Sequence, residues 1–220
     1  VNFNNACNLA CSYCSPQFSS TWAAEAKEHG AWPTSTPHND PAHFTGDRRA
    51  IPNREENPYR EAFWKWWPEL RQTLNIMRVT GGEPTLHKST WQLLDKIEAD
   101  PMPWLELNIN SNLGTKNILI DRLATKVKKF CDEDKIQSFK LFTSLDTWGP
   151  RAEYIRNGLD LELWEQNFHT DLTKSDIPIT FMVTFNIFSV TTFKSLLEKF
   201  LEWRRQYGWY EHKTSDKHRV

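Results

Sequence analysis

Apolar residues recur along the chain at two different periods. Spacings of three and four residues predict helices, whereas alternation or a short apolar run predicts a strand. The predicted strands span residues 1–4, 76–80, 104–110, 136–145 and 177–188. The predicted helices span residues 20–28 (with Ser20 or Thr21 as the N-cap), 59–74, 89–99, 116–130, 159–175 and 191–207. Strands that alternate with helices indicate βαβ units around a parallel sheet, so we expect an α/β fold.

Length and charge narrow the class of protein. The chain has 220 residues, 39% of them hydrophobic, which is enough for one domain with its own core. A net charge of −1 gives no general electrostatic reason to bind nucleic acid or an anionic membrane. No apolar run approaches the roughly 18 residues of a membrane-spanning helix, and no secretory signal is visible. Because the chain begins at Val1 rather than Met and stops at Val220 in a polar stretch, we expect a fragment trimmed at one or both ends. A sixth strand is expected to begin near Arg219.

Three of the four cysteines lie within eight residues, at Cys7, Cys11 and Cys14. A disulfide-rich secreted domain spreads its cysteines along the chain, so this spacing indicates a metal or cluster in a reducing compartment. Three thiolates on a tight loop can hold three irons of a cubane cluster and leave the fourth iron open. A structural zinc ion would need a fourth ligand. Three histidines can supply it: His29, His38 and His43. Spacing alone leaves both alternatives open.

A second motif, Gly81-Gly82-Glu83-Pro84, directly follows a predicted strand. It matches neither of the glycine-rich phosphate loops. Two glycines permit a backbone conformation that a side chain would block, and they expose peptide carbonyls. Carbonyls beside the Glu83 carboxylate would form a site for an ammonium group. The alternative is an ordinary turn with a surface glutamate.

The remaining polar motifs also follow predicted strands. They are Asn110-Ser111-Asn112, Ser144-Leu145-Asp146 and Asn186. In a parallel α/β barrel, sites form at the C-terminal ends of the strands. We therefore expect one rim to collect all of these groups together with the cysteine loop.

CNLACSYC at residues 7–14 and GGEP at residues 81–84 together resemble the radical S-adenosylmethionine (SAM) superfamily, whose motif is CxxxCx(aromatic)C. The resemblance covers nearly the whole chain, because the later elements fit in order. It implies one core domain over residues 1–220, a partial (β/α)6 TIM-like barrel truncated after the fifth βα unit. It also implies a [4Fe-4S] cluster that reductively cleaves SAM to methionine and a 5′-deoxyadenosyl radical, which abstracts hydrogen from a substrate. An external flavodoxin- or ferredoxin-like electron donor and a cytoplasmic location are implied as well.

The resemblance gives a role to each matching position. The expected cluster ligands are Cys7, Cys11 and Cys14. The residues expected to hold the methionyl amino group of SAM are Gly81, Gly82 and Glu83. Tyr13 takes the aromatic position beside the adenine, and Ser111 with Asn112 lies near the methionine moiety.

Three further positions resemble the peptide-modifying and molybdopterin-pathway branches. Ser144 and Asp146 match the SLD segment, where the serine reaches SAM, and Arg156 matches the arginine of an (I/Y)RxG segment that pairs with the SAM carboxylate. The residues expected to flank the adenine are Met182, Val183 and Asn186. Plainer alternatives are a surface charge for Arg156, turn caps for Ser144 and Asp146, and core positions for Met182 and Val183.

Two features depart from the family pattern. A Trp-rich insertion at about residues 15–75 carries five tryptophans: Trp22, Trp32, Trp64, Trp66 and Trp67. It can form a lid or substrate platform, although we expect Trp64 and Trp67 to pack as core and His38 and His43 to be solvated. The SLD and (I/Y)RxG segments are typical of the branch with a twitch or SPASM extension. Its auxiliary clusters need more cysteines, and only Cys131 remains, which we expect to be a core thiol at a helix end.

The sequence therefore predicts a radical SAM enzyme. By analogy with the twitch branch, the first expected substrate is a peptide or protein side chain, and a small metabolite or nucleoside is the alternative. Two non-enzymatic alternatives remain open. One is an iron–sulfur or zinc protein that binds a partner through the cysteine loop, and the other is a degenerate barrel that serves as an interaction module.

Overall fold

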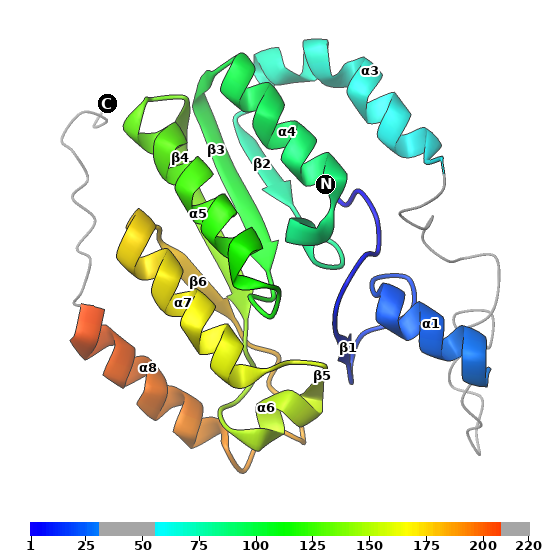
Figure 1. Ribbon diagram of the computed structural model, residues 1–220, viewed down its shortest axis with the longest axis vertical. Helices are drawn as coiled ribbons and strands as arrows, with labels where there is room; N and C mark the ends of the chain where they lie inside the picture. Colours follow the sequence, from blue (N-terminus) through cyan, green and yellow to red (C-terminus); the bar gives the residue numbers. More distant parts are fainter. Residues whose placement is uncertain (31–55, 208–220) are drawn as a thin grey trace.

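Strands and helices alternate through the computed structural model, which describes residues 1–30 and 56–207 (Figure 1). The helices are α1 (Ser20–His29), α3 (Pro58–Thr73), α4 (Lys88–Ala99), α5 (Asn117–Asp132), α6 (Pro150–Ile155), α7 (Leu161–Ser175) and α8 (Phe193–Tyr207), with a short 3-10 helix η1 (Pro84–Leu86). The strands are β1 (Ala10–Cys11), β2 (Ile76–Val79), β3 (Met102–Ser111), β4 (Ile136–Ser144), β5 (Arg156–Asn157) and β6 (Ile179–Met182). Within these ranges, no helix has the length and apolar character needed to cross a membrane.

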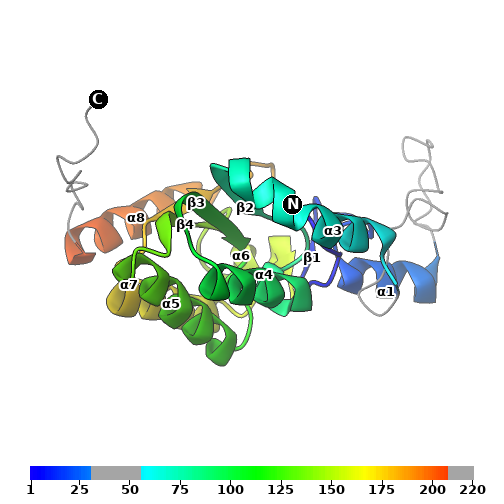
Figure 2. The same cartoon turned by 90° about the horizontal axis from the view of Figure 1, so that it is seen from above.

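Four parallel strands form one sheet in the order β2-β3-β4-β6. Helices α4, α5 and α7 lie side by side over one face of it (Figures 1 and 2). Along β3, Leu105, Leu107 and Ile109 are fully buried on this face, because alternate side chains of a strand point to the same side. The predicted α/β fold with a parallel sheet is confirmed. Over residues 1–30 and 56–207 the sheet is open and closes no barrel, and the strand expected near Arg219 lies outside the described residues.

The predicted first strand is wrong. Residues 1–4 make one isolated parallel bridge, between Asn2 and Thr80. Asparagine side chains divert the backbone from a regular ladder, since Asn4 Oδ1 accepts a hydrogen bond from the Ala6 N–H at 2.8 Å. The segment still runs beside the end of β2, so the cysteine loop starts next to the loop that follows β2.

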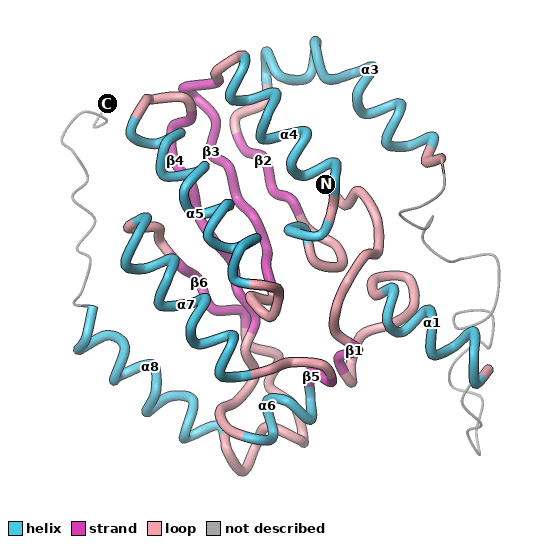
Figure 3. The backbone as a smooth tube through the Cα atoms, viewed as in Figure 1, coloured by secondary structure: helices cyan, strands magenta, loops and turns pink. Residues whose placement is uncertain are grey.

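The last predicted strand, residues 177–188, is shorter than expected. Strand β6 ends at Met182, and two residues later the Thr184 N–H donates to a side chain, Asp146 Oδ1 at 2.8 Å, instead of to a strand carbonyl. Helix α6 and the short strands β1 and β5 were not predicted at all. Helix α6 begins at a Gly149-Pro150 step, and β1 pairs antiparallel with β5 (Figure 3). Two-residue strands carry no periodic signal.

The tryptophans of α3 divide between core and surface. Trp67 is buried, and Trp64 stacks on Phe3 with ring centroids 5.8 Å apart, so the predicted core packing of these two residues is confirmed. Trp66 is 54% exposed. Trp32, together with His38 and His43, lies outside the described residues.

Cys131 is exposed, so its prediction as a core thiol is wrong. The buried positions of α5 recur at helical spacing and end with Val127 and Phe130. Cys131 follows Phe130 by one residue, which turns its side chain about 100° around the helix, away from that buried stripe.

Candidate functional site

A cavity of about 300 Å³ lies where the parallel strands end. Strands β2, β3, β4 and β6 all terminate at this edge, and the cysteine loop meets them there. The residues singled out in the sequence that line the cavity are Cys7, Cys11, Tyr13, Cys14, Gly81, Gly82, Asn110, Ser111, Asn112, Ser144, Arg156 and Met182. Segments that are far apart in the sequence therefore share one concave surface.

The first turn of α1 holds the cysteine loop. Ser20 Oγ lies 3.0 Å from both the backbone nitrogen and the carbonyl oxygen of Cys7, and Thr21 Oγ1 donates to that carbonyl at 2.8 Å. The predicted N-cap of Ser20 or Thr21 is wrong because these hydroxyls bind the loop. The N-cap is Ser19, whose Oγ accepts from the Trp22 N–H at 3.2 Å.

The two glycines bring the second motif against the cysteine loop. Gly81 and Gly82 have φ values of +86° and +48°, a region that residues with a Cβ rarely adopt. A Cβ on Gly82 would lie 2.2 Å from the Ala6 carbonyl oxygen. The Glu83 N–H donates to the same oxygen at 2.7 Å. Because Ala6 directly precedes Cys7, the two sequence motifs are in backbone contact.

Glu83 is fully buried beneath the cavity and does not line it. Its Oε1 accepts from the Thr85 N–H at 3.1 Å, from Thr85 Oγ1 at 2.8 Å and from Ser111 Oγ at 3.0 Å, and its Oε2 accepts from the Asn112 N–H at 2.6 Å. Burial raises the pKa of this carboxyl, and the four hydrogen bonds oppose that change. Glu83 thus ties the GGEP loop to the end of β3. The sequence suggested either a site for an ammonium group or a turn with a surface glutamate. Neither interpretation matches the structure, since the carboxylate neither faces the cavity nor lies on the surface.

A second buried carboxylate organises the opposite wall. Arg156 Nε lies 2.8 Å from Asp146 Oδ2, and Arg156 Nη2 donates to Asp146 Oδ1 at 3.2 Å. The Tyr13 hydroxyl donates to Oδ2 at 2.7 Å, and the Thr184 N–H donates to Oδ1. Both members of the ion pair are buried, so the alternatives of a surface charge for Arg156 and a turn cap for Asp146 are wrong. Arg156 has a carboxylate partner within the chain.

The three clustered thiols are free and all line the cavity. Asn112 Nδ2 lies 3.9 Å from Cys7 Sγ, and Arg156 Nη1 lies 3.7 Å from Cys11 Sγ. Burial raises the pKa of all three thiols, that of Cys7 to about 12. Thiolates are the metal ligands, so loading a metal here would release protons to the solvent.

No three His, Cys, Asp or Glu side chains among residues 1–30, 56–170 and 176–207 form a group that could hold a metal ion. A single ion needs all of its ligands in one coordination sphere, whereas in a cubane each thiolate binds a different iron. Both the zinc ion and the cluster therefore stay alternatives, because two of the suggested fourth zinc ligands, His38 and His43, lie outside the described residues. Of the suggested fourth ligands, His29 is exposed at the end of α1.

Val183 and Asn186 do not line the cavity. Val183 packs against the core, which was its plainer alternative. Asn186 closes a turn, in which its Oδ1 accepts from the Phe188 N–H at 2.9 Å and its Nδ2 donates to the Thr184 carbonyl at 2.8 Å. Met182 lines the cavity and is 40% exposed, so its core alternative is wrong.

Two residues that hold the site were missed. The Trp22 indole N–H donates to the Cys11 carbonyl at 2.8 Å. His87 Nε2 lies 3.0 Å from the Ala6 carbonyl, and because a carbonyl only accepts, this nitrogen carries the proton. Burial lowers the pKa of His87 to about 4, so the ring is neutral near pH 7. Trp22 follows the cysteine loop closely in sequence, and His87 follows the GGEP motif. No local sequence pattern indicates which carbonyl oxygen either side chain binds.

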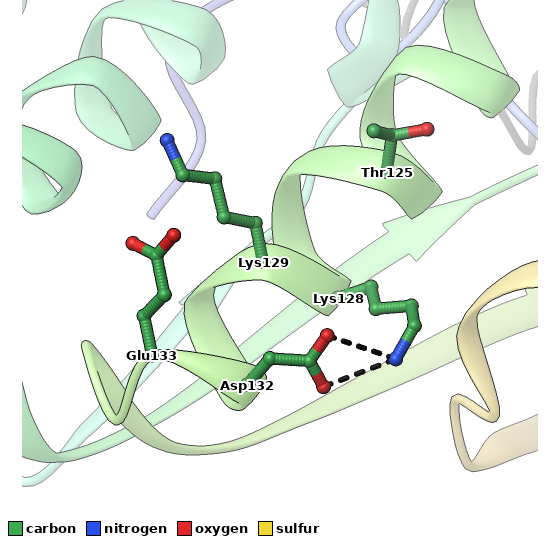
Figure 4. A pocket seen from close by; sticks show the side chains of 5 residues that line it. All are labelled: Thr125, Lys128, Lys129, Asp132 and Glu133. Carbon is green, nitrogen blue, oxygen red and sulfur yellow. Dashed lines mark hydrogen bonds and ion pairs between the residues drawn. The ribbon is translucent and has the colours of Figure 1, made fainter.

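A second hollow, of about 430 Å³, lies over the C-terminal half of α5 (Figure 4). Its five lining residues are exposed and include an ion pair between Lys128 and Asp132 at 2.9 Å. It lies away from the strand ends and contains no buried polar group. We regard it as a solvated helix surface.

No family model matches this chain, and comparisons with curated proteins and with solved structures find no match. The chemistry of this protein must therefore be inferred from the residues of the cavity.

Proposed function

We propose that the protein is a radical SAM enzyme with a core of the partial TIM-like barrel type. The observation that carries the proposal is the convergence of Cys7, Cys11 and Cys14 with both glycines of the GGEP motif on one cavity. Neither motif alone is decisive. A chance cysteine loop would have no reason to contact a second motif almost 70 residues later at the carbonyl preceding its first cysteine.

The donor set fits a [4Fe-4S] cluster with one iron open to SAM. Three thiols can bind three irons, and no fourth protein thiol lines the cavity. When bound, the cluster and SAM supply the reductive cleavage that yields a 5′-deoxyadenosyl radical for hydrogen abstraction. The chain's own contribution is to hold the ligands, since Ser20, Thr21 and Trp22 fix the carbonyls of the cysteine loop. N–H groups of Asn112 and Arg156 close to the sulfurs would stabilise the thiolate form.

Ser144 is the group most open to SAM. Its side chain lines the cavity at the end of β4 and makes no hydrogen bond to any residue in the described ranges. Gly81 and Gly82 add backbone polar groups to the same wall. The volume lies at the small end of the range for ligand sites, and the wall continues onto a sheet face.

For the substrate we propose a peptide or protein side chain, which can approach over that face of the sheet. An external one-electron donor of the flavodoxin or ferredoxin type and a reducing, cytoplasmic location belong to the same proposal. Water excluded from the buried walls would protect a radical from quenching.

The deciding experiment measures 5′-deoxyadenosine released from SAM by protein reconstituted anaerobically with iron and sulfide and reduced with dithionite. Cys14→Ala removes one expected ligand. Cys131→Ala is the matched control, because this free cysteine is exposed on α5 and does not line the cavity. We expect release from the wild type and the control and none from Cys14→Ala, with iron and sulfide content lowered only in Cys14→Ala.

Full iron and sulfide content without any release would reject the enzyme and favour the iron–sulfur interaction protein. Equal iron content in all three proteins would reject the cysteine loop as a cluster site.

A further inference from the structure

One face of the sheet carries polar rather than aliphatic side chains. The register places Arg78, Asn108 and Lys140 in one row across β2, β3 and β4. Because these positions alternate with the buried Val79, Ile109 and Leu141, they lie on the face opposite the one that α4, α5 and α7 cover (Figure 2). Parallel sheets usually have both faces packed with aliphatic residues. Arg78 is exposed, Lys140 is half-buried and Asn108 between them is buried, so the two cations are the members of this row that a polar ligand can reach.

The polar face is continuous with the cavity. Asn110, Ser144 and Met182 line the cavity and belong to this face. Arg78 contacts two of them, since its Nε donates to Asn110 Oδ1 at 2.9 Å and its Nη2 lies 3.3 Å from Met182 Sδ. Its guanidinium carbon lies 4.0 Å from the centroid of the Phe142 ring. These contacts hold Arg78 in a fixed orientation directly behind the cavity wall.

The two cations of this row have no acidic partner among the side chains that the structure describes. Neither Arg78 nor Lys140 forms an ion pair with a carboxylate of residues 1–30, 56–170 or 176–207. Glu106 is on the same face but one row further from the cavity, and its Oε1 accepts from Asn108 Nδ2 at 2.8 Å. An excess of positive charge therefore lies beside the cavity.

We propose that Arg78 and Lys140 bind a carboxylate of the substrate and hold its neighbouring carbons at the cavity. The two residues are two strand spacings apart, about 10 Å between backbones, so their long side chains can converge on one group above Asn108. A guanidinium offers paired N–H donors that match a carboxylate. The inference rests on the proposed function and narrows it to acidic peptide segments. A phosphorylated peptide presents the same oxyanion chemistry and is the other source to distinguish.

The test uses fluorescein-labelled peptides of one neutral background sequence that contain two glutamates, two phosphoserines or two glutamines. Binding to the full chain is followed by fluorescence anisotropy for the wild type, Arg78→Gln and Lys140→Gln. Arg122→Gln is the matched control. The guanidinium carbon of Arg122 also lies over an aromatic ring, 4.1 Å from the centroid of the Trp91 ring, but Arg122 is on α5 and not on the polar face of the sheet. We expect tighter binding of the glutamate peptide than of its glutamine counterpart. Each of the two variants should weaken it about tenfold, and the control should not.

Binding that ignores the glutamate-to-glutamine change, an absence of binding to all three peptides, or an equal loss in Arg122→Gln would overturn the proposal. If the wild type binds the phosphoserine peptide more tightly than the glutamate peptide, and both variants lose this preference, the two residues still form an oxyanion site. The proposal that its ligand is a carboxylate would then be overturned. Because binding needs neither SAM nor reductant, the two proposals fail separately. Selective acidic binding without 5′-deoxyadenosine release rejects only the enzyme, and release without charge preference rejects only the oxyanion site.

Discussion

Replacing Asp146 by asparagine is expected to destabilise the protein much more than the same change at a surface aspartate. The side chain of Asp146 is fully buried, and that of Arg156 is 7% exposed. The amide oxygen of the new side chain could still accept a hydrogen bond from Tyr13 or Thr184, but the guanidinium would lose its counter-ion. Removing one partner of a buried ion pair costs about 3–5 kcal/mol. That is a large part of the roughly 5–15 kcal/mol by which a domain is stable.

The comparison is with Asp132→Asn. Asp132 pairs with Lys128 one turn away on α5, and both side chains are about half exposed, at 59% and 46%. Such exposed helix pairs contribute about 0.3–0.5 kcal/mol. With a slope of about 2 kcal/mol per molar urea, Asp146→Asn should lower the unfolding midpoint by roughly 2 M and Asp132→Asn by roughly 0.2 M.

The assay is equilibrium urea unfolding followed by tryptophan fluorescence and circular dichroism. The double variant Asp146→Asn with Arg156→Gln should recover part of the loss, because no buried cation remains. Equal midpoints for Asp146→Asn and Asp132→Asn would show that the buried pair does not stabilise this wall of the cavity.

The elements were predictable where local pattern and tertiary packing agree. The buried stripe of α5 and the alternation along β3 are both visible in the sequence and both match the core. Prediction failed where side chains from distant elements redirect the backbone. The sequence of residues 177–188 predicts one long strand. In the structure β6 ends early, and the Thr184 N–H donates a hydrogen bond to the Asp146 carboxylate instead of to a neighbouring strand.

The position of the cavity was predictable because the GGEP motif, residues 110–112 and residues 144–146 each lie at the end of a strand, and strand ends of a parallel sheet share one edge. The orientation of individual side chains was not. Tyr13 binds Asp146, 133 residues later, and Glu83 binds the end of β3, so neither partner has a local signal. Both carboxylates were expected to act at the cavity surface, yet each is buried beneath it and joins two loops.

Three further changes test how these loops are held. Gly82→Ala should lower stability by several kcal/mol and reduce iron content, because its Cβ would meet the Ala6 carbonyl. Gly149→Ala, with a similar positive φ but no atom within 4 Å of the added Cβ, should cost only the backbone strain of about 1–3 kcal/mol, and equal losses would contradict the contact. Trp22→Phe removes the hydrogen bond to the Cys11 carbonyl and should lower iron retention, whereas Trp66→Phe, at an exposed position of α3, should not. His87→Gln tests pH dependence. Because burial lowers the pKa of His87 from 6.5 to about 4, the unfolded chain takes up a proton first as the pH falls. Wild-type stability should therefore decline between pH 6.5 and 4 by up to roughly 3 kcal/mol more than that of His87→Gln, and parallel curves in urea titrations would refute a buried neutral histidine.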